Sequence, residues 1–307
     1  MTQKIIIDTD PGIDDAMAIF YAGLSDDIDL IAMTSVFGNV TADIATRNAL
    51  VLGDMLKQEI PVAKGATHPL VQAPNPVSDY VHGVEGFGDI PAQTTKRHAV
   101  DQPAHEYLCD LINEHAGDVI LCPVGPLTNI ALALRHDPSI TTKVKSVVIM
   151  GGGLHSGGNV TEYAEANIWN DPDAADVVFA ADWEVTVIGL DVTQKVISTH
   201  DDFAAAAKSA PVLGGFLSKA TDYYIKFYRE VVGIDGCQMH DPITVVACIY
   251  PDLFKYEYHP LEVCLNSDRI GETRISADSA RRNAKVAVGV DVDAVKKVFF
   301  DTIKTGY

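Results

Sequence analysis

The chain has 307 residues, of which 47% are hydrophobic, and its 42 acidic and 23 basic side chains give a formal net charge of −19. This length is sufficient for one large α/β domain or two smaller ones. The acidic excess argues against a nucleic-acid polymer as partner, because Lys and Arg supply the usual phosphate contacts. No apolar run approaches the roughly 20 residues that span a bilayer, so no membrane partner is expected.

Strand-like and helical patterns alternate along most of the chain, which predicts an α/β fold with an open, mostly parallel, doubly wound sheet flanked by helices. Strands are expected at residues 4–7, 29–36, 118–122, 145–150 and 184–189. Strands such as Ser146-Val147-Val148-Ile149-Met150 are continuously apolar, as is typical of strands that helices cover on both faces. Helices are expected at residues 14–24, 41–57, 103–115, 127–135, 172–181, 211–231 and 241–249.

The last part of the chain departs from this alternation. Extended runs at 258–265, 270–276 and 285–290 predict a small β addition before a final helix at 292–304. The irregular stretch 65–101 is long for a loop in a compact domain, and such loops are usually functional or mobile. No linker or repeat divides the chain, so residues 1–307 are expected to form a single domain.

Cysteine usage and the amino terminus bear on the compartment. The five cysteines are scattered and form no C-x-x-C pair. The first residues lead directly into a strand without a signal-peptide pattern. We therefore expect reduced core thiols in a cytoplasmic protein.

Three Asp-Pro pairs have a structural interpretation as helix starts. Asp137-Pro138 and Asp171-Pro172 have the pattern of an N-cap followed by proline at the first helical position. His240-Asp241-Pro242 shows the same pattern, and alone it would be assigned to structure. The glycine run 151–153 lacks the G-x-G-x-x-G spacing of a dinucleotide-binding loop.

Asp8, Asp10, Asp14 and Asp15 are gathered directly after the first predicted strand. Like charges about 4 Å apart repel by roughly 4 kcal/mol at an intermediate effective dielectric. Such a loop either holds a cation or is simply solvated, and the spacing alone leaves both possibilities open.

Further polar groups follow the other predicted strands, and the carboxyl ends of parallel strands meet at one sheet edge. Asn39 follows the second strand, and the segments 122–129 and 150–153 follow the third and fourth. Asn and Glu side chains in the next segment suit the hydroxyls of a neutral sugar; they are Asn159, Glu165, Asn167 and Asn170.

Two aromatic features remain ambiguous from the residues alone. His82 is either a surface loop histidine or a catalytic group. The helical stripe of Tyr223, Tyr224, Phe227 and Tyr228 is either core or part of a binding wall.

Six blocks together resemble the calcium-dependent, inosine–uridine-preferring nucleoside hydrolase family. The first is Asp8 to Ala16, which looks like the family's amino-terminal signature. The others match in order and at similar spacing across essentially the whole chain: Val36-Phe37-Gly38-Asn39, Gly125-Pro126-Leu127-Thr128-Asn129, Met150-Gly151-Gly152-Gly153, Glu165-Ala166-Asn167 and His240-Asp241-Pro242.

This resemblance implies hydrolysis of the N-glycosidic bond of ribonucleosides to ribose and free base. One Ca²⁺ per subunit would be held by Asp10, Asp15, Asp241 and the backbone carbonyl of Val124. A calcium-bound water would attack the sugar, and Asp10 would take its proton. The resemblance also leads us to expect a homo-oligomer, a dimer or a tetramer.

The resemblance further assigns the substrate contacts. Asp14 and Asn167 would hold the ribose 2′ and 3′ hydroxyls, Asn159 and Glu165 the 5′ hydroxyl, and Asn39 and Met150 would line the ribose pocket. His240 and His82 are the candidate acids facing the leaving base, with Tyr224 and Tyr228 beside them.

Two positions depart from the family pattern, which often has Thr at 124 and commonly Phe at 166. Val124 contributes only a main-chain oxygen, so its change is harmless. Ala166 removes an aromatic surface near the nucleoside and affects base preference. Because Trp occurs only at 169 and 183, a purine-specific stacking lid is disfavoured. We expect broad activity on uridine, inosine and cytidine.

Three other interpretations compete with this one. A haloacid-dehalogenase-like phosphatase would use Asp8 as nucleophile and Asp10 as acid. A calcium-dependent sugar-binding protein would need no acid beside the base. A nucleosidase of the same family devoted to a modified riboside is the nearest alternative.

Overall fold

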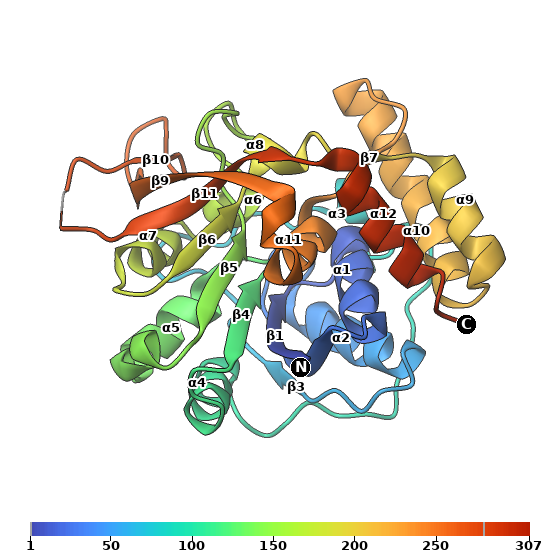
Figure 1. Ribbon diagram of the computed structural model, residues 1–307, viewed down its shortest axis with the longest axis horizontal. Helices are drawn as coiled ribbons and strands as arrows, with labels where there is room; N and C mark the ends of the chain where they lie inside the picture. Colours follow the sequence, from blue (N-terminus) through green and yellow to red (C-terminus); the bar gives the residue numbers. More distant parts are fainter. Residues whose placement is uncertain (1, 279) are drawn as a thin grey trace.

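The computed structural model describes residues 2–278 and 280–307. Within them, a nine-stranded sheet has the order β10-β9-β11-β6-β5-β4-β1-β2-β3 (Figure 1). Its strands are β1 Gln3–Thr9, β2 Ile28–Ser35, β3 Val62–Lys64, β4 Val119–Pro123, β5 Ser146–Met150, β6 Val185–Ile188, β9 Phe254–Val263, β10 Thr273–Ile275 and β11 Asn283–Val290. A separate two-stranded sheet pairs β7 Ile197–Ser198 with β8 Cys237–Gln238.

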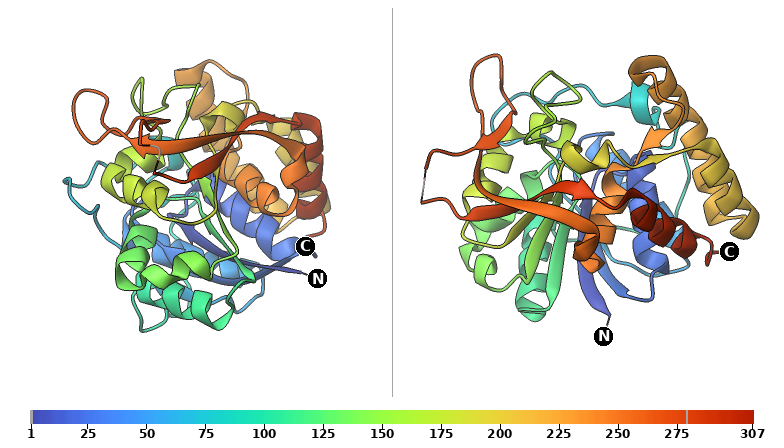
Figure 2. Two further views of the ribbon diagram at one scale, coloured as in Figure 1. Left: turned by 60° about the vertical axis from the view of Figure 1, so that its left-hand side comes forward. Right: turned by 45° about the horizontal axis from the view of Figure 1, so that its top comes forward.

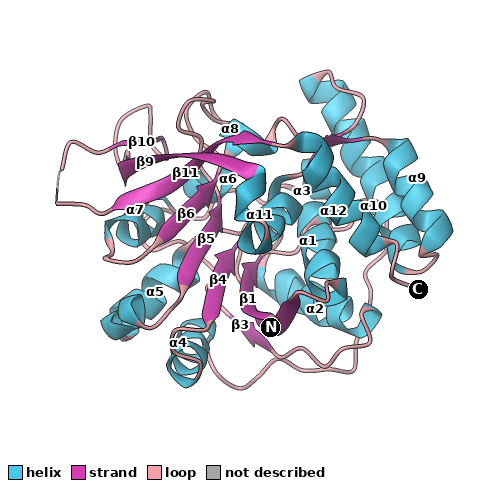
Figure 3. Ribbon diagram, viewed as in Figure 1, coloured by secondary structure: helices cyan, strands magenta, loops and turns pink. Residues whose placement is uncertain are grey.

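Helices cover both faces of the large sheet (Figure 3). They are α1 Ile13–Leu24, α2 Ala42–Met55, α3 Asp79–His82, α4 Ala104–Glu114, α5 Thr128–His136, α6 Ala166–Asn170, α7 Pro172–Ala180, α8 Leu190–Thr193, α9 His200–Ser209, α10 Leu213–Phe227, α11 His240–Ile249 and α12 Val292–Ile303. Helices α4, α5 and α7 lie on one face, and α1, α2, α11 and α12 lie on the other (Figure 1).

The large sheet separates two hydrophobic cores, and the alternating side chains of β1 contribute to both. Ile5 and Ile7 pack into the core that contains α1 and α11, whereas Ile6 packs into the core that contains α4 and α5. All three side chains are fully buried. Successive side chains of a strand point to opposite faces, so a run of isoleucines is what a doubly covered strand requires.

The five predicted strands are confirmed, and they form the parallel centre of the sheet. The β addition predicted for the tail is confirmed, and the structure shows where it attaches. β11 pairs in parallel with β6, and β9 and β10 extend the same sheet antiparallel to their neighbours. The addition therefore continues the large sheet, because β11 hydrogen-bonds directly to the edge of β6.

Two helical regions differ from expectation. The helix predicted at 211–231 ends as an α-helix at Phe227 and continues as a π-helical turn over Tyr228–Val232. Helix α9 was not predicted at all; it packs along α10. A π-helical turn is frequent at functional sites, and this one borders the pocket described below.

The irregular stretch 65–101 contains only the short helix α3 and an isolated bridge between Ala63 and Val100. The right-hand view of Figure 2 shows α3 beside α10. This contact brings a loop that follows β3 to the same end of the molecule as the π-helical turn.

The strand order creates a topological switch point between β1 and β4. From β1 the chain proceeds to β2 and β3 on one side, and β4, β5 and β6 lie on the other. Ligands in open α/β sheets bind outside the carboxyl ends of the strands at such a point. The acidic loop after β1 lies there.

Asp171 caps helix α7, as predicted, and it also bonds to two other parts of the chain. Its Oδ1 accepts from the Ala174 amide (3.0 Å), and its Oδ2 accepts from Thr128 Oγ1 (2.6 Å) and the Leu70 amide (2.9 Å). It is fully buried, so it joins α7, α5 and the loop after β3.

Replacing Asp171 with Ala removes all three acceptors, and we expect the free energy of unfolding to fall by about 2 kcal/mol or more. Urea denaturation followed by circular dichroism measures this loss. Asp137→Ala is the matched control, because Asp137 also caps a helical turn, over Pro138–Thr142, but is only half-buried. It should cost about 1 kcal/mol or less. Equal losses would contradict the bridging role of Asp171.

Candidate active site

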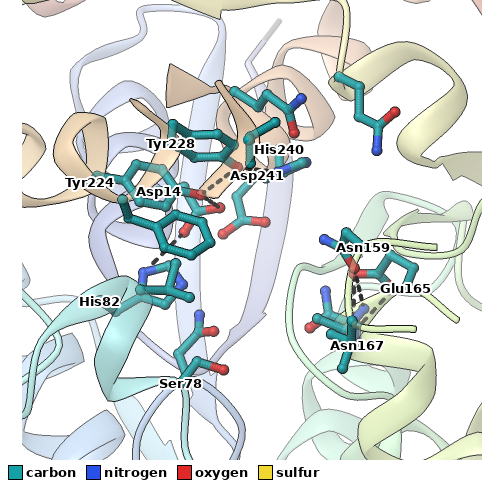
Figure 4. Close-up of a pocket in the computed structure, with 18 of the residues that line it drawn as sticks. Asp14, Ser78, His82, Asn159, Glu165, Asn167, Tyr224, Tyr228, His240 and Asp241 are labelled. Carbon is teal, nitrogen blue, oxygen red and sulfur yellow. Dashed lines mark hydrogen bonds and ion pairs between the residues drawn. The ribbon is translucent and has the colours of Figure 1, made fainter. Parts of the chain in front are cut away.

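A cavity of about 270 Å³ opens at the carboxyl ends of the central strands. One wall carries Asp14, His82, Tyr224, Tyr228, His240 and Asp241, and the facing wall carries Asn159, Glu165 and Asn167 (Figure 4). The cavity thus lies between a wall of acids and rings and a wall of amides and one carboxyl group.

Asp10 follows strand β1, is 1% exposed and is not among the residues that line the cavity. Its Oδ2 accepts from the Asn39 amide (2.6 Å), and its Oδ1 has no hydrogen-bond partner among the described residues. A Cβ atom at Gly38 or Gly125 would come within 2.1 or 2.6 Å of the Asp10 carboxylate. Glycine at these two positions therefore lets the loops after β2 and β4 close on Asp10.

Asp15 is held by several donors, which come from the acidic loop and from Asn39. Its carboxylate accepts from the Thr9 hydroxyl, from the Gly12 amide at 2.9 Å and from Asn39 Nδ2 at 3.1 Å. A carboxylate bonded in this way is fixed in orientation and needs no basic partner.

The buried carboxylates form a potential cation site. Oxygen atoms of Asp14, Asp15 and Asp241 lie within 4.8 Å of one another. Burial raises the pKa of Asp241 well above its ordinary value, and the charges of Asp14, Asp15 and Asp10 raise it further. The described residues that line the cavity include no Lys or Arg. Since Asp10 Oδ1 and Asp14 Oδ1 are buried and unpaired, these oxygens suit a hard divalent cation.

The grouping differs in one respect from the ligand set that the resemblance implied. The mutually close trio includes Asp14, which the resemblance assigned to the sugar, and does not include Asp10. Val124, the other implied ligand, accepts from Asn167 Nδ2 (2.8 Å) through its carbonyl and lines the cavity. Asp14, Val124 and Asp241 line the cavity, whereas Asp10 and Asp15 lie outside its lining and are joined to it through Asn39, which lines the cavity and donates to both carboxylates.

Glu165 organises the facing wall. It caps α6 by accepting from the amides of Asn167 (3.0 Å) and Ile168 (3.1 Å), and it also accepts from the Gly152 amide (2.9 Å). Burial raises the pKa of Glu165 to about 7, although these donors act in the opposite direction. Asn159 Oδ1 accepts from the Ala166 amide (3.0 Å). These bonds orient the carboxyl and amide groups beside the cavity.

A chain of hydrogen bonds runs along the opposite wall. Tyr224 donates to Asp14 Oδ2 (3.2 Å), its hydroxyl lies 3.4 Å from that of Tyr228, and the Tyr228 hydroxyl lies 2.8 Å from His240 Nε2. His240 Nδ1 lies 2.8 Å from Thr193 Oγ1. Both ring nitrogens of His240 are therefore engaged. Burial lowers the pKa of His240 to about 4, and His82 acts in the same direction.

His82 is buried and lines the cavity, so it is not a surface loop histidine. Its Nδ1 accepts from the Ile13 amide (3.2 Å), which leaves Nε2 to carry the proton of the neutral ring. Burial lowers the pKa of His82 to about 4. The ring also packs on Tyr224, with centroids 5.3 Å apart.

Two alternative interpretations of these residues, a helix cap at Asp241 and a phosphatase nucleophile at Asp8, do not agree with the structure. Met239, not an Asp, occupies the N-cap position of α11, so His240-Asp241-Pro242 is not a third Asp-Pro cap. Asp8 is fully buried; its Oδ1 accepts from Thr34 Oγ1 (2.5 Å) and Asn129 Nδ2 (2.7 Å). These two bonds tie β1 to β2 and α5, which is a structural role for the residue that a phosphatase would use as its nucleophile.

Every predicted substrate contact lines the cavity: Asp14, Asn39, Met150, Asn159, Glu165, Asn167, Tyr224 and Tyr228. Asn170 does not, although it is buried. The sequence pattern did not point to Ser78, Gln194 and Gln238, which line the cavity, or to Thr193, which contacts His240 from behind the lining. The signal for Thr193 and Gln194 was their place just after a predicted strand.

Comparison with known proteins agrees with this geometry. Residues 5–297 match the family described as inosine-uridine preferring nucleoside hydrolase. The chain belongs to this family. It is 38% identical to uridine nucleosidase 1 of Arabidopsis thaliana over 304 residues, which are 95% of this chain and 90% of that protein.

Two solved nucleoside hydrolases share the fold. A plant nucleoside hydrolase superposes with a TM-score of 0.96 at 35% identity and covers 99% of both chains. A purine-preferring ribonucleoside hydrolase from Gardnerella vaginalis gives a TM-score of 0.95 at 35% identity, over 99% of this chain and 98% of that one. No described helix of this chain is long and apolar enough to cross a membrane.

Chelation should destabilise this nucleoside hydrolase, because it leaves the buried carboxylates to repel one another. Adding Ca²⁺ at about 100 times its dissociation constant should restore roughly 2.7 kcal/mol. Thermal unfolding in EDTA, and after Ca²⁺ is returned, measures the shift. Asp10→Asn should melt higher than the wild type in EDTA and gain less from Ca²⁺.

Asp118→Asn is the control for this prediction, since Asp118 is an exposed acid paired with Lys4 far from the cavity. Its melting temperature should rise on addition of Ca²⁺ by as much as that of the wild type. A melting temperature that is indifferent to EDTA and Ca²⁺ would show that the cluster holds no such ion.

Proposed function

We propose that this protein hydrolyses the N-glycosidic bond of ribonucleosides, with uridine, inosine and cytidine as substrates, to give ribose and free base. The observation that carries the proposal is the cavity itself. Three features face one space. They are the carboxylates Asp14 and Asp241, a wall of amides with one carboxyl group, and the relay, which is the hydrogen-bonded chain from Asp14 through Tyr224 and Tyr228 to His240. The described lining residues include no Lys or Arg. Such a cavity suits an uncharged polyol joined to a flat ring.

The amide wall supports the sugar assignments. Asn167 donates through Nδ2 to Val124 and Met150, and its Oδ1 makes no hydrogen bond among the described residues. With Asp14 it can hold the 2′ and 3′ hydroxyls, and Asn159 and Glu165 can hold the 5′ hydroxyl. A site built around a hydroxyl strongly rejects the analogue without it.

We assign the cation site to Ca²⁺, one per subunit, held by Asp10, Asp15, Asp241 and the Val124 carbonyl, with Asp14 adjoining. The donor set fits, because it is all oxygen and includes unpaired buried carboxylate atoms. A bound calcium ion supplies positive charge beside the sugar and polarises the oxygens that it contacts.

Asp10 is the base of the proposed mechanism. Its Oδ1 is a hydrogen-bond acceptor that no described protein group fills. Its Oδ2 is fixed by the Asn39 amide. Asp10 Oδ1 therefore accepts the proton of the attacking water, while the sugar passes through a state with oxocarbenium character.

The relay is the proposed route for the proton that the leaving base takes. Tyr228 gives its hydroxyl proton to the leaving base, and His240 Nε2 passes a proton from solvent at the open cavity back to Tyr228. The proton of the attacking water leaves Asp10 for solvent, so one water is consumed overall. His82 presents Nε2–H from the neighbouring segment and is the second candidate acid. A neutral relay is appropriate here, because the pKa values of both histidines are low in the buried pocket.

We further propose that residues 1–307 act as one domain, in the cytoplasm, as a dimer or a tetramer. The continuous nine-stranded sheet supports the single domain. The five cysteines, all unpaired as predicted, support a reducing compartment.

Incubation of the purified protein with uridine should release equimolar ribose and uracil without phosphate. Deoxyuridine should be a poor substrate, with kcat/KM lower by about 10⁴-fold, because Asp14 and Asn167 would lose the 2′ hydroxyl. Base release is followed by ultraviolet absorbance and ribose by a reducing-sugar assay.

Ribose 1-phosphate as product, or equal efficiency on uridine and deoxyuridine, would contradict this mechanism. Binding of ribosides without turnover would instead identify a sugar-binding protein. Turnover of a modified riboside alone would favour the specialised nucleosidase.

His240→Ala should slow uridine and inosine hydrolysis by roughly 10²–10⁴-fold, because general acid catalysis is lost. Tyr228→Phe removes only the hydroxyl that links His240 to the relay, so it should reproduce much of that loss. The two variants are assayed beside the wild type on p-nitrophenyl riboside, whose leaving group needs no proton. The rate of p-nitrophenyl riboside hydrolysis should be nearly the same in both variants as in the wild type. An equal loss on all substrates would assign His240 to structure.

A further inference from the structure

Two glutamines line the cavity without a role in the mechanism above. Gln194 follows helix α8, and Gln238 lies in strand β8. Both are half-buried, so their side chains are accessible from the cavity. Among the described residues, neither side-chain amide hydrogen-bonds to another protein group. Each therefore keeps a free carbonyl acceptor and a free NH₂ donor.

Both glutamines belong to the segments that hold His240. Gln194 is next to Thr193, whose hydroxyl contacts His240 Nδ1. Gln238 lies two residues before His240, and the intervening Met239 is fully buried, as is Cys237. Alternation of side chains along extended backbone puts Gln238 and His240 on the cavity side. The two amides thus flank the group proposed to serve the leaving base.

The surroundings of these amides match the two surfaces of a nucleobase. Tyr224, Phe227 and Tyr228 offer aromatic contact for the flat face of a ring. Val231 and Val232, on the π-helical turn, are exposed apolar side chains at the cavity rim. The polar edge of the base then needs donors and acceptors, and the glutamines supply both.

We infer that Gln194 and Gln238 bind the polar edge of the leaving base and are base-specificity residues. This inference rests on the proposed function and deepens it. An amide pairs with the N–H and carbonyl edge of uracil, and after rotation it pairs equally well with the amino group and ring nitrogen of cytosine. Glutamine at both positions therefore accepts keto and amino pyrimidines alike, and the activity is broad.

The test is to replace each amide by an isosteric carboxylate. A carboxylate only accepts hydrogen bonds, so it favours the amino group of cytosine and repels the two carbonyl oxygens of uracil. In Gln194→Glu, in Gln238→Glu or in the double variant, the cytidine-to-uridine ratio of kcat/KM should rise by at least about tenfold. The ratio compares two substrates on one preparation, so partial loss of folded enzyme cancels.

Two controls accompany these variants. Gln58→Glu makes the same change at an exposed site in the turn before β3, and its ratio should equal that of the wild type. Gln194→Met/Gln238→Met removes both amides without adding charge. It should lower kcat/KM for both nucleosides by a similar factor. If the carboxylate variants fail to fold, this variant still tests whether the two amides contact the base.

A ratio within twofold of the wild type in both single variants and in the double variant would overturn the inference. So would a methionine double variant with unchanged kcat/KM on both nucleosides. Failure of the proposed function is a separate result, because in that case the wild type itself would release no base from any ribonucleoside.

Discussion

The structure depends on one constraint, the burial of like-charged carboxylates at the switch point of the sheet. Asp10, Asp15 and Asp241 are each at most 3% exposed, and no described Lys or Arg lines the cavity to balance them. Backbone and side-chain donors hold part of the Asp10 and Asp15 carboxylates, and glycine at 38 and 125 lets the loops after β2 and β4 approach Asp10. Among the described residues, Asp10 Oδ1 and Asp14 Oδ1 stay buried without a hydrogen-bond partner, and the cation proposed above would balance the charge of this cluster.

The sequence predicted the part of the site that is local. Asp10, Asp14 and Asp15 follow a strand within a few residues, so their convergence could be inferred from the end of that strand. Asp241 lies more than 200 residues away, and only resemblance to a family connected it to them. The glutamines and Thr193 escaped notice because their positions depend on the short helix α8 and the two-residue strands β7 and β8, which have no periodicity to detect.

The same distinction between local and non-local signals explains which parts of the fold could be predicted. The central strands were predictable because burial on both faces makes them continuously apolar, as Ile5 to Ile7 show. The parallel pairing of β11 with β6 could not be predicted, because it is a non-local backbone contact that no side-chain pattern in 285–290 specifies. The predicted helix 211–231 kept its aromatic stripe, but the ambiguity between core and binding wall was resolved only by packing. Tyr224 and Tyr228 are both buried and part of the cavity.

Burial shifts the acids and the histidines in opposite directions, and this bears on how a proton reaches the base. It raises the pKa values of Asp14 and Glu165 and lowers those of His82 and His240. All of these shifts favour neutral groups, which is the expected effect of a pocket that excludes water. A free imidazolium is therefore not the resting donor at neutral pH. In the proposed mechanism the donor would be an O–H or N–H of a neutral chain, and the hydrogen-bonded chain of this pocket runs from His240 through Tyr228 and Tyr224 to Asp14. One end of this relay would then lie beside the base, and the other lies at Asp14 in the potential cation site, so a continuous set of hydrogen bonds would join the two halves of the reaction.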